Sequence, residues 1–196
     1  TLWTGQLKVG DKVRVLPEGL DARIRNLQVH GRSAKHASAG DRTAVALTGG
    51  GADRSVVSRG ATLVTSPAWS PTWMLTAYVR MLPDAGWSLK HNQRVHVHHG
   101  TAEVLARCAL LEAEPLAPGE RGWVQLRLET PIVARARDRF VIRAYSPVTT
   151  IGGGIIAEPN PPKRNRIADD VRESLGVIVG GGGSEEAISA CLSLAG

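Results

Sequence analysis

The fold of this chain is constrained most by short runs in which apolar and polar residues alternate. Each run ends at glycine or proline. Within residues 1–66 the breaks fall at Gly10-Asp11, Pro17-Glu18-Gly19 and Gly49-Gly50-Gly51. The runs themselves are Lys12 to Leu16, Ala22 to Val29, Arg42 to Leu47 and Ala61 to Val64. A period of two puts apolar side chains on one face of a strand. This spacing predicts a small antiparallel β-barrel over residues 1–66.

A second set of alternating runs follows a proline-containing linker. Pro67 and Pro71 forbid a continuing strand ladder, so the segment Ser66 to Thr72 is expected to be extended. The later runs are Met74 to Leu82, Gln93 to His98, Thr101 to Leu111, Gly122 to Leu128, Ile132 to Ala134, Arg139 to Arg143 and Val148 to Ile151. Closing a sheet removes its exposed edges. We therefore expect an all-β fold of two consecutive antiparallel barrels, the second over residues 67–158.

The character of the chain changes over residues 159–196. Three prolines followed by Lys163, Arg164 and Arg166 predict a stiff basic linker. Ile167 to Leu175 has the spacing of an amphipathic helix, and Ser184 followed by two glutamates starts a second helix over Ala187 to Leu194. Two such helices bury little surface by themselves. The segment is expected to be the truncated start of a further helical domain.

The charge of the chain favours an anionic partner. Lys and Arg number 24 against 18 Asp and Glu, a formal charge of +6, and most of the cations are Arg, whose planar fork suits phosphate. Ordinary solubility charge is the alternative explanation. Cys108 and Cys191 lack CxxC spacing, and no apolar stretch reaches the roughly 18 residues of a membrane span. We expect a cytoplasmic protein without membrane contact.

The search for catalytic groups is mostly negative. No GxxxxGK[ST] phosphate loop occurs, so nucleotide hydrolysis is not expected from these residues. His96 and His98 would share one face of a strand and His99 the other, with no Cys or carboxylate partner obvious nearby, so no metal site is expected. A polar strand surface or an RNA-facing edge is favoured. Cys108, in an alternating strand, is expected to be a buried small residue rather than a nucleophile.

The glutamates around Arg107 and the tryptophans are explained without a binding or catalytic role. Glu103, Glu112 and Glu114 lie along one predicted strand and its end with Arg107 near, which indicates a solvated charged face. The five tryptophans are scattered, and we expect most of them to pack in the core or between domains. They are Trp3, Trp69, Trp73, Trp87 and Trp123.

The stretch from Arg25 to Gly60 is the most informative, because it combines basic residues with strand edges suited to binding. Its motifs are Arg25-Asn26-Leu27-Gln28-Val29-His30, Ala39-Gly40-Asp41-Arg42-Thr43-Ala44-Val45-Ala46-Leu47 and Ser58-Arg59-Gly60. With Thr1-Leu2-Trp3-Thr4-Gly5 and Val9-Gly10-Asp11-Lys12-Val13, they resemble domain II of translational GTPases. The resemblance is closest to the selenocysteine-specific elongation factors, the SelB family.

The second half agrees with this resemblance. Its motifs are Val95-His96-Val97-His98-His99-Gly100-Thr101-Ala102-Glu103-Val104, Arg139-Phe140-Val141-Ile142-Arg143 and Thr150-Ile151-Gly152-Gly153-Gly154. They look like domain III of the same family, and the resemblance covers residues 1–158. The general elongation factor EF-Tu shares the barrels but not these combinations. Residues 159–196 resemble a basic linker and the beginning of the family's winged-helix extension.

The resemblance implies roles for individual residues. Gln28 matches a position against the terminal adenine of the tRNA, His30 one beside the esterified amino acid, and Arg42 the amino-acid pocket. A guanidinium there would favour an ionised selenol over a serine hydroxyl. Arg59 matches a contact to the tRNA 5′ end, and His98, His99 and Arg143 match the surface that meets the acceptor and T stems.

Simpler explanations remain open for Arg42 and Arg59. Arg42 could pair with Asp41 or Asp53 at a barrel rim, and Arg59 could brace a turn.

The function implied is the tRNA-binding portion of a GTP-dependent factor that delivers selenocysteinyl-tRNA to the ribosome at recoded UGA codons. GTP and Mg would belong to a GTPase domain upstream of Thr1, which would also complete the amino-acid pocket. The messenger hairpin would be read by C-terminal domains absent here. We expect no catalysis, cofactor or metal within the chain itself, and a monomer. The alternatives are another translational GTPase, or a β-barrel adaptor that docks on a protein through Trp3, Trp69 and Trp73.

Overall fold

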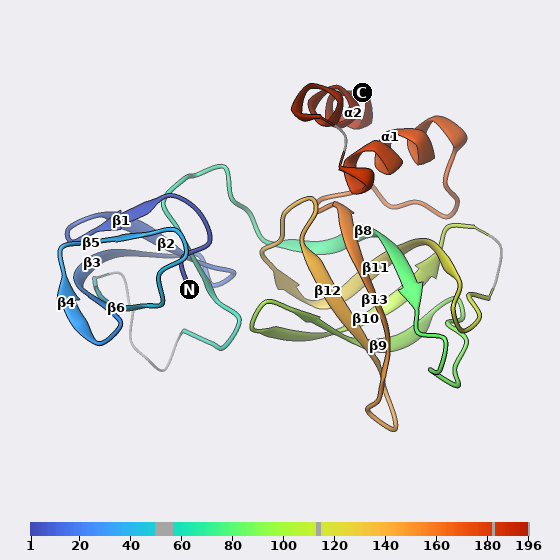
Figure 1. Cartoon of the computed structure of the whole chain (residues 1–196), viewed down its shortest axis with the longest axis horizontal. Helices are drawn as coiled ribbons and strands as arrows, with labels where there is room; N and C mark the ends of the chain where they lie inside the picture. The colour runs from blue at the N-terminus through green and yellow to red at the C-terminus, as the bar shows by residue number, and fades with distance from the viewer. Residues whose placement is uncertain (50–56, 113–114, 182, 196) are drawn as a thin grey trace. The chain divides into compact units, whose positions relative to one another are not determined.

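The computed structural model describes residues 1–49, 57–112, 115–181 and 183–195. These residues form two compact units, Thr1–Ser70 and Pro71–Gly196 (Figure 1). Strands dominate both units, and the two helices belong to the second. The residues between the last strand of the first unit and the first strand of the second, 65–71, form no strand, as the linker prolines predict.

The first unit contains seven strands in its described residues. They are β1 (Gln6–Lys8), β2 (Lys12–Leu16), β3 (Leu20–Val29), β4 (Arg32–Ala34), β5 (His36–Ser38), β6 (Thr43–Thr48) and β7 (Thr62–Val64). One sheet has the order β4-β3-β2-β7, with β6 also paired to β3, and β1 pairs separately with β5. A small apolar core is formed by Leu7, Val13, Ala22, Ile24, Leu27 and Ala37.

The closed barrel expected for this unit is not what its described strands form. They make an open five-stranded sheet and a separate two-stranded one. The three strands that the sequence did not predict, β1, β4 and β5, have three residues each, too few for a period of two to be recognised. In β3 a bulge between Ile24 and Asn26 interrupts the ladder to β6 and bends the strand.

The second unit is a closed six-stranded barrel, as predicted. Its strands are β8 (Thr72–Met81), β9 (Gln93–His99), β10 (Ala102–Leu110), β11 (Arg121–Ile132), β12 (Arg139–Ala144) and β13 (Thr150–Glu158). They close in the order β10-β11-β8-β13-β12-β9, with antiparallel pairs. Alternate residues such as Leu75, Val97, Leu126 and Ile142 fill the interior and are fully buried.

The glycine triplet of β13 is explained by strand packing. The predicted run ended at Ile151, whereas the strand continues through the glycines to Glu158. A Cβ on Gly152 would lie 2.6 Å from the Arg80 carbonyl oxygen, and one on Gly153 would lie 2.6 Å from the Phe140 carbonyl oxygen. Glycine at these positions lets β13 lie against its neighbours in the barrel.

Helix α1 (Asp169–Gly180) packs on the outside of the barrel, against β13, and α2 (Ser184–Ala195) packs on α1 (Figure 1). Gly181 ends α1 with φ 80°, a left-handed conformation that glycine adopts easily. The shared apolar cluster contains Leu111, Trp123, Ala157, Ile167, Leu175, Ile178 and Ala190. The helices expected to begin a further domain are therefore packed as a layer of the barrel unit. No helix in the described part of the chain is long and apolar enough to cross a membrane.

Candidate nucleic-acid interface

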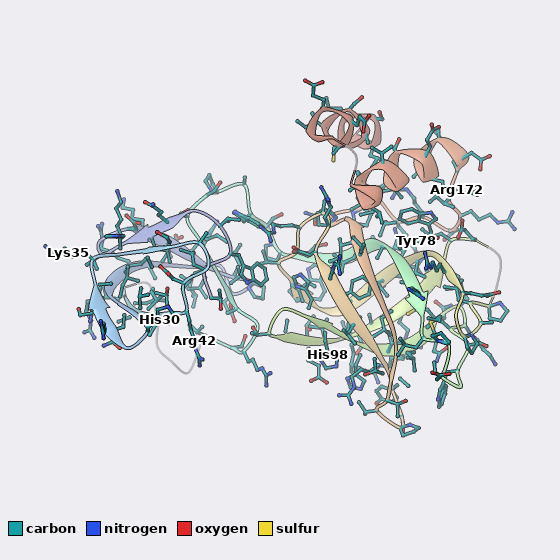
Figure 2. All side chains as sticks on the ribbon, in the orientation of Figure 1. His30, Lys35, Arg42, Tyr78, His98 and Arg172 are labelled. Atoms are coloured by element: carbon teal, nitrogen blue, oxygen red, sulfur yellow. The ribbon has the colours of Figure 1, made fainter. Side chains whose placement is uncertain are left out.

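Three of the predicted pocket residues meet at one end of the β3–β6 ladder. Gln28 pairs with Ala44 in the ladder, and just beyond it the His30 amide donates to the Arg42 carbonyl at 3.4 Å. His30 has a φ of 50°, which turns the chain out of β3. The side chains of Gln28, His30 and Arg42 are all exposed, and Figure 2 shows His30 and Arg42 near each other. The end of this ladder thus presents an amide, an imidazole and a guanidinium to solvent.

The guanidinium of Arg42 is not neutralised by its sequence neighbour. The Asp41 carboxylate instead accepts a hydrogen bond of 2.8 Å from the Ser38 amide. Within the described residues Arg42 forms no ion pair, and Asp53, the other proposed partner, lies outside them. A cation without a counter-ion at a strand end is suited to an anionic ligand.

Arg59 lies in a different place from these three. Ser58 donates its hydroxyl to Glu18 at 2.6 Å, which fastens this turn beside the start of β3, whereas Gln28 and His30 are at its end. Burial acts to raise the pKa of Glu18, but the hydrogen bonds from Ser58 outweigh burial and lower it. The turn is braced by Ser58 and Glu18, and the Arg59 side chain is exposed. In the described structure no hydrogen bond or ion pair joins Arg59 to Gln28, His30 or Arg42.

The positive charge of the chain is concentrated in the first unit. Residues 1–70 hold 10 of the 24 Lys and Arg and 5 of the 18 Asp and Glu, so this unit carries a formal +5 of the total +6. A unit with a net positive charge draws polyanions toward it.

In the second unit, a column of flat side chains runs over the outer face of β9 and β12. The Arg94 guanidinium lies over the Tyr145 ring at 4.7 Å. Tyr145 stacks with His96 at 5.7 Å and 17°, and His96 lies 6.5 Å from His98 at 23°. Arg94 and Tyr145 were not predicted from the sequence, although Tyr145 follows Arg143 at the two-residue spacing of one strand face.

Two carboxylates flank this column. Glu129 accepts two bonds from Arg94, at 2.7 and 2.5 Å, and Glu103 Oε1 lies 3.0 Å from His96 Nδ1. The expectation that the histidines have no carboxylate partner was therefore wrong. Glu103 is five positions beyond His98 in sequence, but the β9–β10 hairpin places these two residues opposite each other. Among the described residues no group of three or more His, Cys, Asp or Glu is arranged to hold a metal ion.

His98 and Arg143 carry nitrogens that are buried without a hydrogen-bond partner in the described structure. These are Nε2 of His98 and Nε of Arg143, while the Arg143 Nη2 donates to the Val148 carbonyl at 3.0 Å. The two residues are diagonal neighbours, since His98 pairs with Val141 and His96 with Arg143. An unpartnered buried donor is costly unless a ligand or water satisfies it.

His99 faces the other way and is 5% exposed. Its Nε2 lies 3.1 Å from Asp138 Oδ2, and the same oxygen accepts the Arg135 amide at 2.9 Å. Burial acts to raise the pKa of Asp138, but hydrogen bonds from His99 and the Arg135 amide, with the charge of Arg135, outweigh burial and lower it. His99 therefore fixes the β11–β12 turn, and we leave it out of the proposed contact surface.

Cys108 and Glu112, also noted in the sequence, are held in the fold of the second unit. Cys108 is fully buried, and burial raises the pKa of its thiol to about 12, so it is not a nucleophile. Glu112 accepts the Trp123 amide at 3.1 Å and lies 3.5 Å from Arg172, rather than facing solvent alone, and Glu114 lies outside the described residues.

Core packing is confirmed for one of the five tryptophans, and packing between domains stays a prediction. Trp123 is in the core, but Trp3, Trp73 and Trp87 are 48%, 60% and 38% exposed.

Comparison with known proteins fits this architecture. The sequence profile of the selenocysteine-specific elongation factor β-barrel domain matches residues 76–163, which span most of the closed barrel. The selenocysteine-specific elongation factor of Desulfomicrobium baculatum is 36% identical over 193 residues, which is 98% of this chain and 30% of that protein. The corresponding factor of Escherichia coli is 29% identical over 85% of the chain and 25% of its own length. The chain belongs to the SelB family.

Solved SelB structures share its fold. The bacterial selenocysteine-specific elongation factor EF-Sec has a TM-score of 0.68 at 25% identity, covering 89% of this chain and 27% of that one. The SelB of Methanococcus maripaludis in its apo form has a TM-score of 0.67 at 24% identity, over 81% of this chain and 38% of that one. The chain thus spans about 30% or less of the SelB relatives that its sequence matches.

Proposed function

We propose that this chain of the SelB family binds the aminoacyl end of selenocysteinyl-tRNA and, in the whole protein, supports GTP-dependent delivery to the ribosome at recoded UGA codons. The observation that carries the proposal is the exposed group of Gln28, His30 and Arg42 at one strand end, with a guanidinium that no described carboxylate neutralises. In this arrangement Gln28 faces the terminal adenine, and His30 and Arg42 face the amino acid.

Arg42 is proposed to supply the selectivity of the pocket. A selenol is largely ionised at neutral pH, whereas a serine hydroxyl is not. A guanidinium donates charge-assisted hydrogen bonds to an anion, and these are stronger than bonds to a neutral hydroxyl. Selenocysteinyl ester would therefore be held more tightly than seryl ester.

Two other surfaces would hold the tRNA through its backbone. Arg59, exposed near the start of β3, is proposed to contact the 5′-terminal phosphate. His98 and Arg143, with their unpartnered buried nitrogens, are proposed to contact the acceptor and T stems through phosphates or 2′-hydroxyls.

The remaining assignments follow from family membership. We propose that residues 1–66 correspond to the domain II barrel, 67–158 to domain III, and 159–196 to the linker and start of the winged-helix region. These 196 residues contain no phosphate-loop sequence, so they offer no site for GTP and Mg, which we assign to a GTPase domain of the whole protein. The messenger hairpin is likewise assigned to other domains, and the protein is proposed to act as a cytoplasmic monomer.

The deciding experiment uses the whole protein, with its GTPase domain. GTP-dependent binding of selenocysteinyl- and seryl-tRNA is measured for the parent, for Arg42→Ala, and for Arg25→Ala as an exposed control on β3. Loss of a charge-assisted bond costs about 1.5–3 kcal/mol, so Arg42→Ala should lose roughly 10- to 100-fold of the selenocysteine preference. The control should keep it. Equal affinity of the parent for the two tRNAs would exclude the selenocysteine assignment.

A protein-docking role is the second candidate, and the exposure of Trp3 and Trp73 favours it. Salt separates the two possibilities. Phosphate-driven binding weakens steeply as ionic strength rises, whereas an apolar docking surface does not.

A further inference from the structure

The linker between β13 and α1 covers polar side chains that the barrel alone would expose. Thr76 of β8 and Gln125 of β11 are paired in the ladder, and both are fully buried. Their immediate neighbours Leu75 and Leu126 belong to the barrel interior, so alternation places Thr76 and Gln125 on the outer face. A glutamine on the outside of a barrel is buried only if another part of the chain lies over it.

Gln125 uses both ends of its amide to hold that covering segment. Its Nε2 donates to the Pro162 carbonyl at 2.9 Å, and its Oε1 accepts the Arg164 amide at 3.1 Å. One side chain thus replaces the pair of backbone partners that a neighbouring strand would supply.

Arg164 then turns back to the barrel. Its Nη1 and Nη2 donate to Glu158 at 2.5 and 3.3 Å, and both side chains are 13% exposed. Two parallel bonds fix the direction as well as the distance of the guanidinium. Lys163 and Arg166, on either side, remain exposed.

The segment beyond Arg164 continues against the barrel. The Ile167 amide donates to the Leu111 carbonyl at 3.1 Å, and Leu175 and Ile178 of α1 pack in the cluster that contains Trp123. Apolar contacts of this kind are not directional. The polar contacts of Gln125 and Glu158 are directional, so they define where the linker and helices sit.

We propose that Gln125, Glu158 and Arg164 form a latch that holds residues 159–180 at one position on the barrel, so that α1 moves with the barrel as one body. The inference does not depend on tRNA binding. The linker was expected to be stiff and basic, and in the structure it is docked on the barrel. One of its three basic side chains, Arg164, belongs to the latch, and the other two face solvent.

Hydrogen exchange of the 196-residue chain without tRNA tests the latch. Gln125→Met and Arg164→Met keep much of the side-chain volume but remove the bonds. The amides of residues 159–180 should exchange at least about tenfold faster in each, which is 1.4 kcal/mol of local opening. Amides of β9 and β12, on the other side of the closed barrel, should be unchanged. The double variant Glu158→Gln/Arg164→Met should exchange no faster than Arg164→Met, because the pair acts as one unit.

Arg166→Met is the matched control, since it removes an exposed arginine of the same linker that makes no bond to the barrel in the described structure. Exchange in this variant should equal that of the parent. Equal rates in the latch and control variants would overturn the proposal. So would a loss of protection that extends to β9 and β12, because the residues would then stabilise the whole barrel rather than the docked segment.

Discussion

A histidine next to a proposed binding surface can serve the fold rather than the ligand. His99 neighbours His98 in sequence, but strand alternation turns it toward Asp138, where the two side chains lie 3.1 Å apart. Asp138 also receives the Arg135 amide and guanidinium. This carboxylate organises the turn between β11 and β12, so its ionisation should be linked to folding.

We expect Asp138→Asn to destabilise the protein at neutral pH. The pKa of Asp138 is lowered in the folded state, so its ionised form contributes stability above the unfolded value of about 3.9. That contribution is lost as pH falls through the folded pKa. The variant should lose about 1–3 kcal/mol at pH 7, and the difference from the parent should shrink below about pH 4. Urea unfolding at several pH values measures it.

Asp84→Asn is the control for this prediction, because Asp84 is exposed in a turn and makes no hydrogen bond or ion pair in the described structure. Its effect on the free energy of unfolding should be within about 0.5 kcal/mol at every pH. A parent-to-variant difference for Asp138→Asn that stays constant down to pH 3 would contradict the linkage.

The sequence could name the candidate binding residues but not their partners. Gln28, His30 and Arg42 come together because β3 pairs with β6, and only the short strands β4 and β5 separate these two in sequence. The column on the second unit depends on β9, β10 and β12 lying side by side. Glu103 therefore escaped notice as a partner of His96, as did the stacking of Tyr145 on the same ring.

At the scale of elements, the glycine triplet of β13 shows how close packing limits side chains. A Cβ at Gly152 would meet the Arg80 carbonyl oxygen at 2.6 Å and the Met81 Cα at 3.3 Å. Both are backbone atoms, so they cannot move aside as a flexible side chain would. The strand must shift, or the barrel must open locally.

Gly152→Ala should therefore lower the free energy of unfolding by about 1–3 kcal/mol. Gly176→Ala in α1 is the matched control, because nothing lies within 4 Å of a Cβ at that position and alanine is the better helix former. The control should be neutral or stabilising by up to about 1 kcal/mol. Denaturant unfolding measures both. Equal effects of the two substitutions would show that the glycines are not required by strand packing.

Most strands were predictable, and the misses have physical causes. Lys12–Leu16 was predicted to the residue because Gly10 and Pro17 bound an alternating run. The continuation of β13 was missed, since glycines carry no apolar signal although they are the residues that fit there. Closure of the second sheet followed from edge protection, whereas the first sheet is open over its described strands.

At the scale of the whole molecule, the two units differ in net charge and in the size of their apolar cores. The first carries a formal +5 and the second +1, because the second holds 14 Lys and Arg against 13 Asp and Glu. Some of these charges are paired, as Arg94 is with Glu129 and Arg164 with Glu158. The second unit has the larger apolar core, with clusters inside and outside its barrel. We infer that the first unit provides most of the attraction for a polyanion.

Replacing Arg25, Arg42 and Arg59 by Gln should therefore reduce the salt dependence of tRNA binding. Each phosphate contact contributes about 0.7–0.9 to the slope of log K against log salt. Arg59 is the proposed phosphate contact, and Arg25 and Arg42 add to the local positive charge, so the slope should fall by at least about 0.7–0.9. Binding of the 196-residue chain to tRNA between about 50 and 200 mM salt, followed by fluorescence anisotropy, gives the slope directly.

The matched control removes the same charge from the second unit, through Arg121→Gln, Arg139→Gln and Arg166→Gln, all at exposed positions. Because these arginines lie outside the proposed contacts, the slope should change by less than the roughly 0.7–0.9 that one phosphate contact contributes. An equal reduction in the two triple variants would mean that net charge, rather than its placement, governs attraction. The smaller reduction in the control separates the two, since both variants carry the same net charge and differ only in which unit lost it.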